Sequence, residues 1–336
     1  MQGYWETIMK YYLKKCGFQE LGSVGDDGKP RRGRYLMTSM NADVLAFFPP
    51  LSKDILNDCA VLPIIPLYTG RKTYVNYVYH NDKFNGSSAK HKRNEYRIYL
   101  NTELENHCYY FESQDIMVMR SEQLSDALQE DGDQIVYYMD VLKDHASSVY
   151  ISLSRYIEEY PITGGYALYD GVLDVFEKKV QKVKSGDYET DIVIDPSVTK
   201  RIEQSADESH QNLFNPATFR DFVLAGFGNA CAITGRKIEN ALGVGIDVVY
   251  IKPRSEGGSC LPSNGLPLTK EFSLLFVQGY FTLSDKYEII VHPDNTSELL
   301  DDLNLRQIRI PPKKLFQPDQ ENLSYHREHV YGSFKK

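Results

Sequence analysis

The chain has 336 residues, of which 42% are apolar and 25% are charged, so it is long enough for two domains with separate cores and has the composition of a globular protein. Its formal net charge of −8 at pH 7 disfavours a general affinity for polyanions. It has no apolar run of about 18 residues and no basic, apolar leader at its N-terminus, so we expect a cytoplasmic protein without a membrane span.

The cysteines exclude two further kinds of site. All five are widely spaced, and none belongs to a CxxC pair. Paired or closely spaced cysteines are what a disulfide framework or a cysteine-based zinc site requires. We therefore expect buried, unpaired thiols.

Acidic and basic residues are unevenly distributed along the chain. Residues 1–122 hold 16 Lys and Arg against 14 Asp and Glu, residues 123–215 hold 8 against 18, and residues 216–336 hold 14 of each. Phosphate binding depends on local clusters of Lys and Arg rather than on total charge. Both ends of the chain can therefore present basic surfaces beside an acidic middle.

The first half of the chain reads mainly as short strands between turn signals. After a predicted helix over 4–17 come strand candidates, and helical spacing over 134–160 precedes one or two closing strands over 166–176. The strand candidates lie at 35–40, 44–48, 61–68, 73–80, 95–100 and 116–120. Short strands at such spacing predict a barrel or a sandwich. We predict an α+β protein with a β-barrel-like domain over 1–184 and an acidic linker over 185–214 that has room for one short helix.

Basic residues collect in the loops between these strands. They are Arg31, Arg32, Arg34, Arg71, Lys90, Lys92, Arg93 and Arg97. Arg suits phosphates and the bidentate recognition of guanine, so these residues are candidate DNA contacts. The segments 94–100 and 111–119 are similar to the B3-like pseudobarrel of some restriction-enzyme recognition domains, which implies duplex DNA as the ligand. The alternative is that the loops are simply solvated on a barrel with another task.

The last third of the chain carries an ordered series of motifs. Its main segments are Asp247-Val248-Val249-Tyr250-Ile251-Lys252-Pro253, Asn264-Gly265-Leu266, Ser273-Leu274-Leu275-Phe276-Val277-Gln278-Gly279 and Leu323-Ser324-Tyr325-His326-Arg327-Glu328. With the flanking segments 219–224 and 229–235, they resemble the HNH (ββα-metal) nuclease domain of bacterial restriction-endonuclease-like proteins. The resemblance covers about 215–333, within a predicted HNH-like domain over 215–336, and implies two strands and a helix clamped around one divalent cation, such as Mg²⁺.

The resemblance also implies which residues should act, and most of them are replaced. Tyr250 stands where the family has the general-base His, and Ser273 and Val277 stand where it has the helix His and the acidic residue. Asn264 is kept. Asp247 could assist Tyr250 only if a bulge turned it, because residues three apart on a strand face opposite sides. Glu256, Glu271 and Ser273 are weak candidate metal ligands.

Three functions remain open at this point. The chain could be a DNA-recognition protein of restriction or phage-defence type whose HNH-like domain is a pseudonuclease. It could be an active metal-dependent endonuclease with an altered site made of Tyr250, Asn264 and Asp247. It could be a scaffold that binds another protein through its acidic middle. In the first two cases the expected partners are duplex DNA and a second copy of the chain, since such proteins often form symmetric dimers.

Two other patterns attract simpler interpretations. Glu177-Lys178-Lys179 follows two aspartates and is best interpreted as a solvated charged edge. His326 and His329 have a spacing that could hold a metal on a helix face, but His326 is expected to tie the C-terminal tail to its domain.

Overall fold

A computed structural model describes residues 10–22, 34–81, 94–105, 111–124, 134–185, 194–205, 213–237 and 245–335. The fold is mixed α+β and divides into two compact units. The N-terminal unit comprises Met1–Glu189 and Val193–Leu213, and the C-terminal unit comprises Phe214–Lys336.

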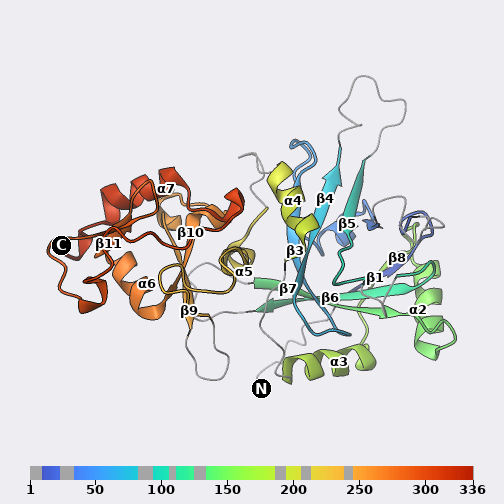
Figure 1. Ribbon diagram of the computed structural model, residues 1–336. Coiled ribbons are helices and arrows are strands. Elements are labelled where there is room, and N and C mark those ends of the chain that lie inside the picture. The colour runs from blue at the N-terminus through green and yellow to red at the C-terminus, as the bar shows by residue number, and fades with distance from the viewer. Residues whose placement is uncertain are drawn as a thin grey trace, which may run out of the picture. The chain divides into compact units, whose positions relative to one another are not determined.

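The N-terminal unit is built on one eight-stranded, barrel-like sheet. Its order is β2-β5-β4-β3-β7-β6-β1-β8, with β3 and β7 parallel and every other neighbouring pair antiparallel. The sheet bends so strongly that β3–β5 and β6–β7 run nearly crosswise (Figure 1). The strands are β1 Tyr11–Lys15, β2 Tyr35–Thr38, β3 Cys59–Pro66, β4 Thr73–His80, β5 Glu95–Tyr99, β6 Ile116–Leu124, β7 Gln134–Leu142 and β8 Tyr166–Tyr169.

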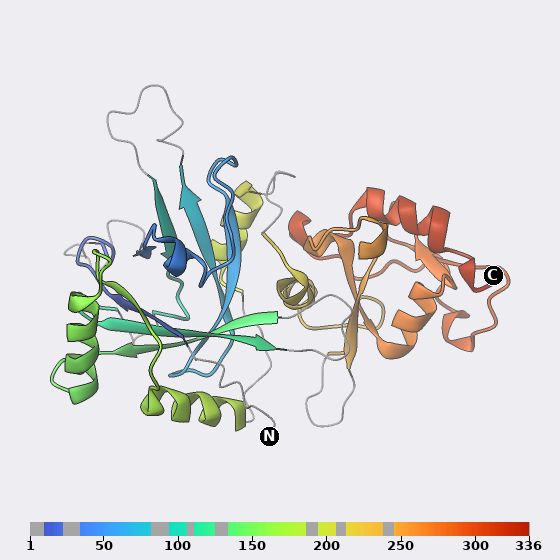
Figure 2. The same cartoon turned by 180° about the vertical axis from the view of Figure 1, so that it is seen from behind.

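Alternating side chains give this sheet two cores. Tyr12, Met117 and Met139 point into one buried cluster, which Phe48 also joins. Tyr11 points into a second cluster on the other face. That face is covered by α2 (Ser148–Glu159) and α3 (Asp174–Ser185), which Figure 2 shows along one side of the sheet. The period-two burial explains why neighbouring residues of one strand serve different cores.

Several predicted elements of this unit are wrong in type. Residues 11–15 form β1 and not a helix, and Ala42–Leu45 forms the short helix α1, capped by the side chain of Asn41, where a strand was predicted. The helical spacing over 134–160 divides into β7 and α2, and the closing strand β8 is followed by α3. The predicted linker contains the helix α4 (Pro196–Ser205), which packs beside β4 within the N-terminal unit.

The C-terminal unit surrounds a two-stranded hairpin with helices. Its longer elements are α5 Pro216–Gly226, β9 Ile246–Tyr250, β10 Gly265–Thr269, α6 Lys270–Val277, β11 Phe281–Leu283, β12 Ile289–Val291 and α7 Gln320–Tyr325. Short 3-10 turns lie at Arg254–Glu256, Pro262–Asn264, Glu298–Leu300, Lys314–Phe316 and Ser333–Lys335, and α7 continues into a π-helical turn at His326–Val330. Phe276, Phe281 and Leu323 are fully buried in its core.

Among the described residues, no helix is both long and apolar enough to cross a membrane.

Candidate functional site

The hairpin β9–β10 and the helix α6 hold the three positions at which the resemblance places the catalytic groups. The strands pair antiparallel, with Tyr250 opposite Gly265 and Asp247 opposite Leu268. The helix α6 follows β10 without a linker and packs on both strands, while α5 also packs against the hairpin. The order strand, loop, strand, helix is therefore present at 246–277.

Asn264 is fully buried and fastens the loop between the two strands. Its Oδ1 accepts from the backbone N–H of Lys252 at 2.9 Å, and its Nδ2 donates to the carbonyls of Lys252 at 3.0 Å and Ser259 at 2.9 Å. The side-chain oxygen and both amide hydrogens are thus engaged with backbone. Asn264 acts here as the clamp of the loop.

Ser273 faces the strand β9 from α6. Its Oγ lies 3.0 Å from Oδ2 of Asp247 and 2.9 Å from the carbonyl of Lys270, and the residue is 5% exposed. The hydroxyl has a single hydrogen, so it donates to one of these two acceptors or shares that hydrogen between them. Asp247 therefore contacts α6 through Ser273.

Tyr250 lies on the opposite face of the hairpin. Its ring stacks on Phe219 of α5 with centroids 4.2 Å apart and planes 5° apart, and its hydroxyl lies 3.8 Å from Sγ of Cys260. Gly265 permits this approach, because a Cβ there would lie 2.3 Å from a methyl of Val223. The pleat sends residues 247 and 250 to opposite faces, so Asp247 meets Ser273 of α6 whereas Tyr250 packs against Phe219 of α5.

The residues present do not fit a divalent cation. Among the described residues, no three His, Cys, Asp or Glu side chains gather in a way that could hold a metal. Glu271 is exposed and bonds the first turn of its own helix and Thr269, which holds the pKa of its carboxyl below the ordinary value. Glu256 lies beside Tyr325 and raises the pKa of that phenol together with desolvation. The candidate ligands Glu256, Glu271 and Ser273 thus have separate surroundings.

His326 is a core residue rather than a metal ligand. Its ring stacks on Phe276 with centroids 3.9 Å apart, Nε2 lies 3.2 Å from the carbonyl of Phe276, and Nδ1 lies 2.9 Å from Oγ1 of Thr282. The carbonyl can only accept, so Nε2 carries the hydrogen and Nδ1 accepts from Thr282. Burial lowers the pKa of His326 to about 4.

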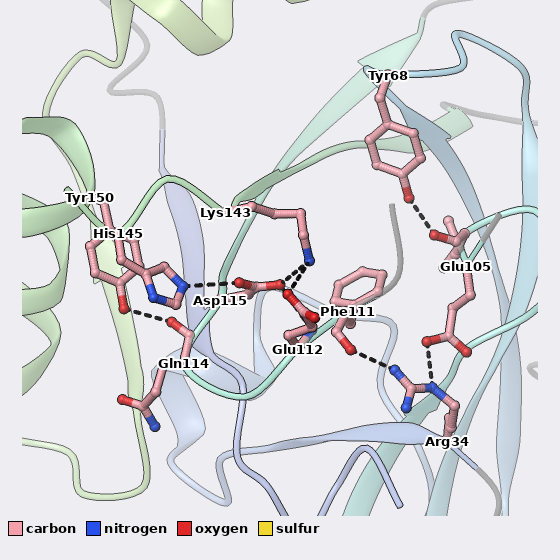
Figure 3. Close-up of polar contacts among 11 residues, drawn as sticks. Arg34, Tyr68, Glu105, Phe111, Glu112, Gln114, Asp115, Lys143, His145 and Tyr150 are labelled. Carbon is pink, nitrogen blue, oxygen red and sulfur yellow. Dashed lines mark hydrogen bonds and ion pairs between the residues drawn. The ribbon is translucent and has the colours of Figure 1, made fainter. Parts of the chain in front are cut away.

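Arg34 is the only predicted DNA contact before β2 that lies within the described residues, and it is buried. It is 8% exposed, pairs with Glu105 at 2.6 Å, and donates to the carbonyls of Leu21 at 2.5 Å and Phe111 at 2.7 Å. Figure 3 shows its guanidinium between Glu105 and Phe111. The donors of Arg34 thus join three segments of the barrel, and a DNA contact through this residue stays a prediction.

The other basic residues predicted to contact DNA differ in their exposure to solvent. Arg71 is half-exposed and pairs with Glu103 at 2.8 Å, whereas Arg97 is nearly buried, pairs with Glu95 and stacks over the ring of Tyr35 at 4.0 Å. Desolvation opposes the charge of Arg97, but bonds to Tyr99 and Glu95 raise its pKa. Arg31, Arg32, Lys90, Lys92 and Arg93 lie outside the described residues, so their role stays a prediction.

A polar network that the sequence did not reveal lies next to Arg34. The buried carboxylate of Asp115 accepts from Lys143 at 2.7 Å, from His145 at 3.0 Å and from the backbone N–H of Glu112 at 2.9 Å (Figure 3). His145 stacks on Tyr150, whose hydroxyl donates to the carbonyl of Gln114. The network ties the turn before β6 to the turn after β7. Single charged residues in turns gave no sequence signal for it.

Two basic residues in the loop between β9 and β10 were also not predicted as functional from the sequence. Lys252 and Arg254 follow β9 directly and lie at the surface of the loop that Asn264 fastens. The family motif drew attention to the positions around them and gave these two no role.

Comparison with known proteins gives little further information. No protein-family model matches the chain, and no curated protein matches it. A solved structure named as the modification-dependent TagI restriction endonuclease is similar at 22% identity and a TM-score of 0.29, over 34% of this chain and 38% of that one. The B3 domain of the UbaLAI restriction endonuclease, solved with cognate DNA, is similar at 14% identity and a TM-score of 0.30, over 48% of this chain and 86% of that one. The chain thus matches well under half the length of the first structure. Overlaps of this quality carry no argument about function.

Proposed function

We propose that the chain is a restriction-endonuclease-like protein of bacterial defence that recognises duplex DNA, and that its C-terminal HNH-like unit holds DNA without cutting it. The proposal rests on the side-chain contacts made at the three motif positions. Asn264 is bonded to Lys252 and Ser259, Ser273 to Asp247, and Tyr250 is stacked on Phe219.

Metal-assisted hydrolysis needs a group that takes a proton from water and a cation that stabilises the phosphate. Tyr250 packs against Phe219 of α5, whereas Ser273 lies on α6 and bonds Asp247 on the other face of the hairpin, so the two motif positions face different ways in this arrangement. The described carboxylates gather at no common point that could hold a cation. The packed surroundings of Tyr250, Asn264 and Ser273 support binding of DNA in preference to its cleavage.

The N-terminal unit supports recognition through its architecture and sequence. The barrel-like sheet contains buried pairs such as Arg34–Glu105, and connecting loops on such a scaffold are the segments that vary most readily. The sequence places Arg31 and Arg32 before β2, and Lys90, Lys92 and Arg93 between β4 and β5. Arg and Lys in loops on a rigid scaffold suit contacts to the DNA backbone and to base edges.

The test combines binding and cleavage on the same purified full-length protein. Plasmid and linear duplex DNA are incubated with it in Mg²⁺, Mn²⁺ and Zn²⁺, and binding is measured by gel shift at low salt. We expect a shift and no nicking. Nicking that disappears in Tyr250→Phe and Asn264→Ala would establish the altered nuclease instead, and absence of any shift would favour the protein-binding scaffold. Sedimentation of the free protein and of the complex tests the predicted homodimer.

A further inference from the structure

The loop from Ile251 to Leu261 is held unusually firmly for a surface segment. Asn264 bonds the N–H and the carbonyl of Lys252, and the N–H of Gly258 donates to the carbonyl of Pro253 at 2.9 Å. A Cβ at Gly258 would lie 2.0 Å from the carbonyl oxygen of Lys252, so only glycine allows the loop to close this tightly. The backbone that carries Lys252 and Arg254 is therefore fixed in place.

Both cations of this loop are directed to its surface. Arg254 is exposed, and Lys252 is half-exposed with its ammonium 5.1 Å from the ring centre of Tyr325. The ring of the exposed His329 lies 4.5 Å from that of Tyr325. Within the described part of the chain, no ion pair joins Lys252 or Arg254 to a carboxylate, whereas Arg71, Arg97 and Arg327 each have one.

We propose that Lys252, Arg254, Tyr325 and His329, here termed the loop patch, bind the sugar–phosphate backbone of duplex DNA. Lys252 and Arg254 supply the charges, and the ring of Tyr325 lies beside the ammonium of Lys252. The inference rests on the proposed function and specifies how the C-terminal unit grips its ligand. The clamp formed by Asn264 then serves binding, since it fixes the position of the two cations.

Phosphate backbone fits this surface better than a specific protein partner does. Two separate cations on a rigid, polar loop can neutralise neighbouring phosphates at little cost in conformational entropy. Of the two rings in the patch, that of Tyr325 already lies beside the Lys252 ammonium and that of His329 is polar, so the patch lacks the apolar centre typical of a protein interface. Glu256 and Glu328 are the acidic neighbours, and each is engaged, with Tyr325 and Ser324 respectively.

The experiment compares two double variants of the full-length protein. Lys252→Gln with Arg254→Gln removes both charges of the loop patch. Lys286→Gln with Arg306→Gln removes two exposed charges elsewhere in the same unit and is the matched control. Binding of a labelled duplex is measured by fluorescence anisotropy over a range of salt concentrations. Each lost phosphate contact lowers the slope of log affinity against log salt by about 0.9.

We expect the slope to fall by about 1.8 in the loop-patch variant and to keep its wild-type value in the control. Equal slopes in the two variants, or an unchanged slope in the first, would overturn the inference while leaving DNA binding by the chain intact. Failure of the wild-type protein to bind duplex at low salt would overturn the proposed function itself. The two failures are therefore distinguishable.

Discussion

Gly265 is the residue on which the packing of the hairpin against α5 depends. A Cβ at this position would lie 2.3 Å from Cγ2 of Val223 and 2.8 Å from Cζ of Phe219. We expect Gly265→Ala to lower the free energy of unfolding of the C-terminal unit by about 1–3 kcal/mol, because the core must be displaced to accept one methyl group. Urea denaturation followed by tyrosine fluorescence measures this. Gly245→Ala is the control, since nothing lies within 4 Å of its Cβ, and an equal loss there would contradict the argument.

His326 predicts an acid-sensitive C-terminal unit. Its pKa is about 4 in the folded state against an ordinary value of 6.5, so between these pH values the unfolded chain binds a proton that the folded chain does not. The free energy of unfolding should therefore fall as pH drops from 6.5 to 4, by up to about 3 kcal/mol from this residue. Denaturation across this pH range should show a shallower dependence in His326→Gln, and an unchanged dependence would refute the assignment.

Individual residues of the site could be predicted to different degrees from the sequence. Asn264 was identified because the motif preserves it, and its bonds to backbone across the loop follow from having both a donor and an acceptor. The partners of Tyr250 and Ser273 could not be predicted, because Phe219 and Asp247 lie 31 and 26 positions away in the sequence and their packing depends on how the helices meet the hairpin. The opposite facing of residues 247 and 250 did follow from the pleat.

At the scale of elements, the sequence located several strands correctly. It also assigned two strands, β1 and β7, as helices. The segments that became β3, β4 and β5 were predicted as strands from their apolar and aromatic runs. β7 was mistaken for a helix because Val136, Tyr137 and Tyr138 are buried toward two cores, so no alternation marks the strand. β1 fits a helical spacing equally well, and its pairing with β6 and β8 decided the outcome.

One buried ion pair of the N-terminal unit joins Arg34, just before β2, to Glu105, after β5. Arg34 and Glu105 have side chains 6% and 11% exposed, whereas Arg71 and Glu103, chemically the same pair, are 45% and 22% exposed. We expect Arg34→Ala to destabilise the N-terminal unit by about 3–5 kcal/mol, because it leaves Glu105 buried and unpaired. Arg71→Ala should change stability by about 0–1 kcal/mol.

Thermal denaturation of both variants checks this contrast. If Arg34→Ala and Arg71→Ala lower the melting temperature equally, the burial of Arg34 does not make its ion pair more important for stability. A DNA contact through Arg34 makes a different prediction. It would alter the salt dependence of binding in variants that remain fully folded, and the buried position of the guanidinium predicts that this dependence stays unchanged.

At the scale of the whole molecule, the net charge of −8 does not describe the local charge at each part of the surface. Several acidic residues of the N-terminal unit are neutralised where they lie, as Asp140 is by Lys179, Glu122 by Lys184, and Asp115 by Lys143. The pairs with Lys184 and Arg120 hold the pKa of Glu122 below its ordinary value. The electrostatic potential at the phosphates of a bound DNA therefore depends on which Lys and Arg side chains have no carboxylate partner.

The salt dependence of DNA binding measures those cations directly. The predicted contacts outside the described residues are Arg31, Arg32, Lys90, Lys92 and Arg93, and the loop patch adds Lys252 and Arg254. If all of them meet phosphates, the slope of log affinity against log salt should approach about −6, and the loop patch alone gives about −2. We expect a value between these limits for full-length protein on a labelled duplex. A slope near zero would show that the net negative charge prevails and that neither unit grips the DNA backbone. The same titration with the five loop cations replaced by Gln should retain the smaller slope, because the loop patch would then hold the duplex alone.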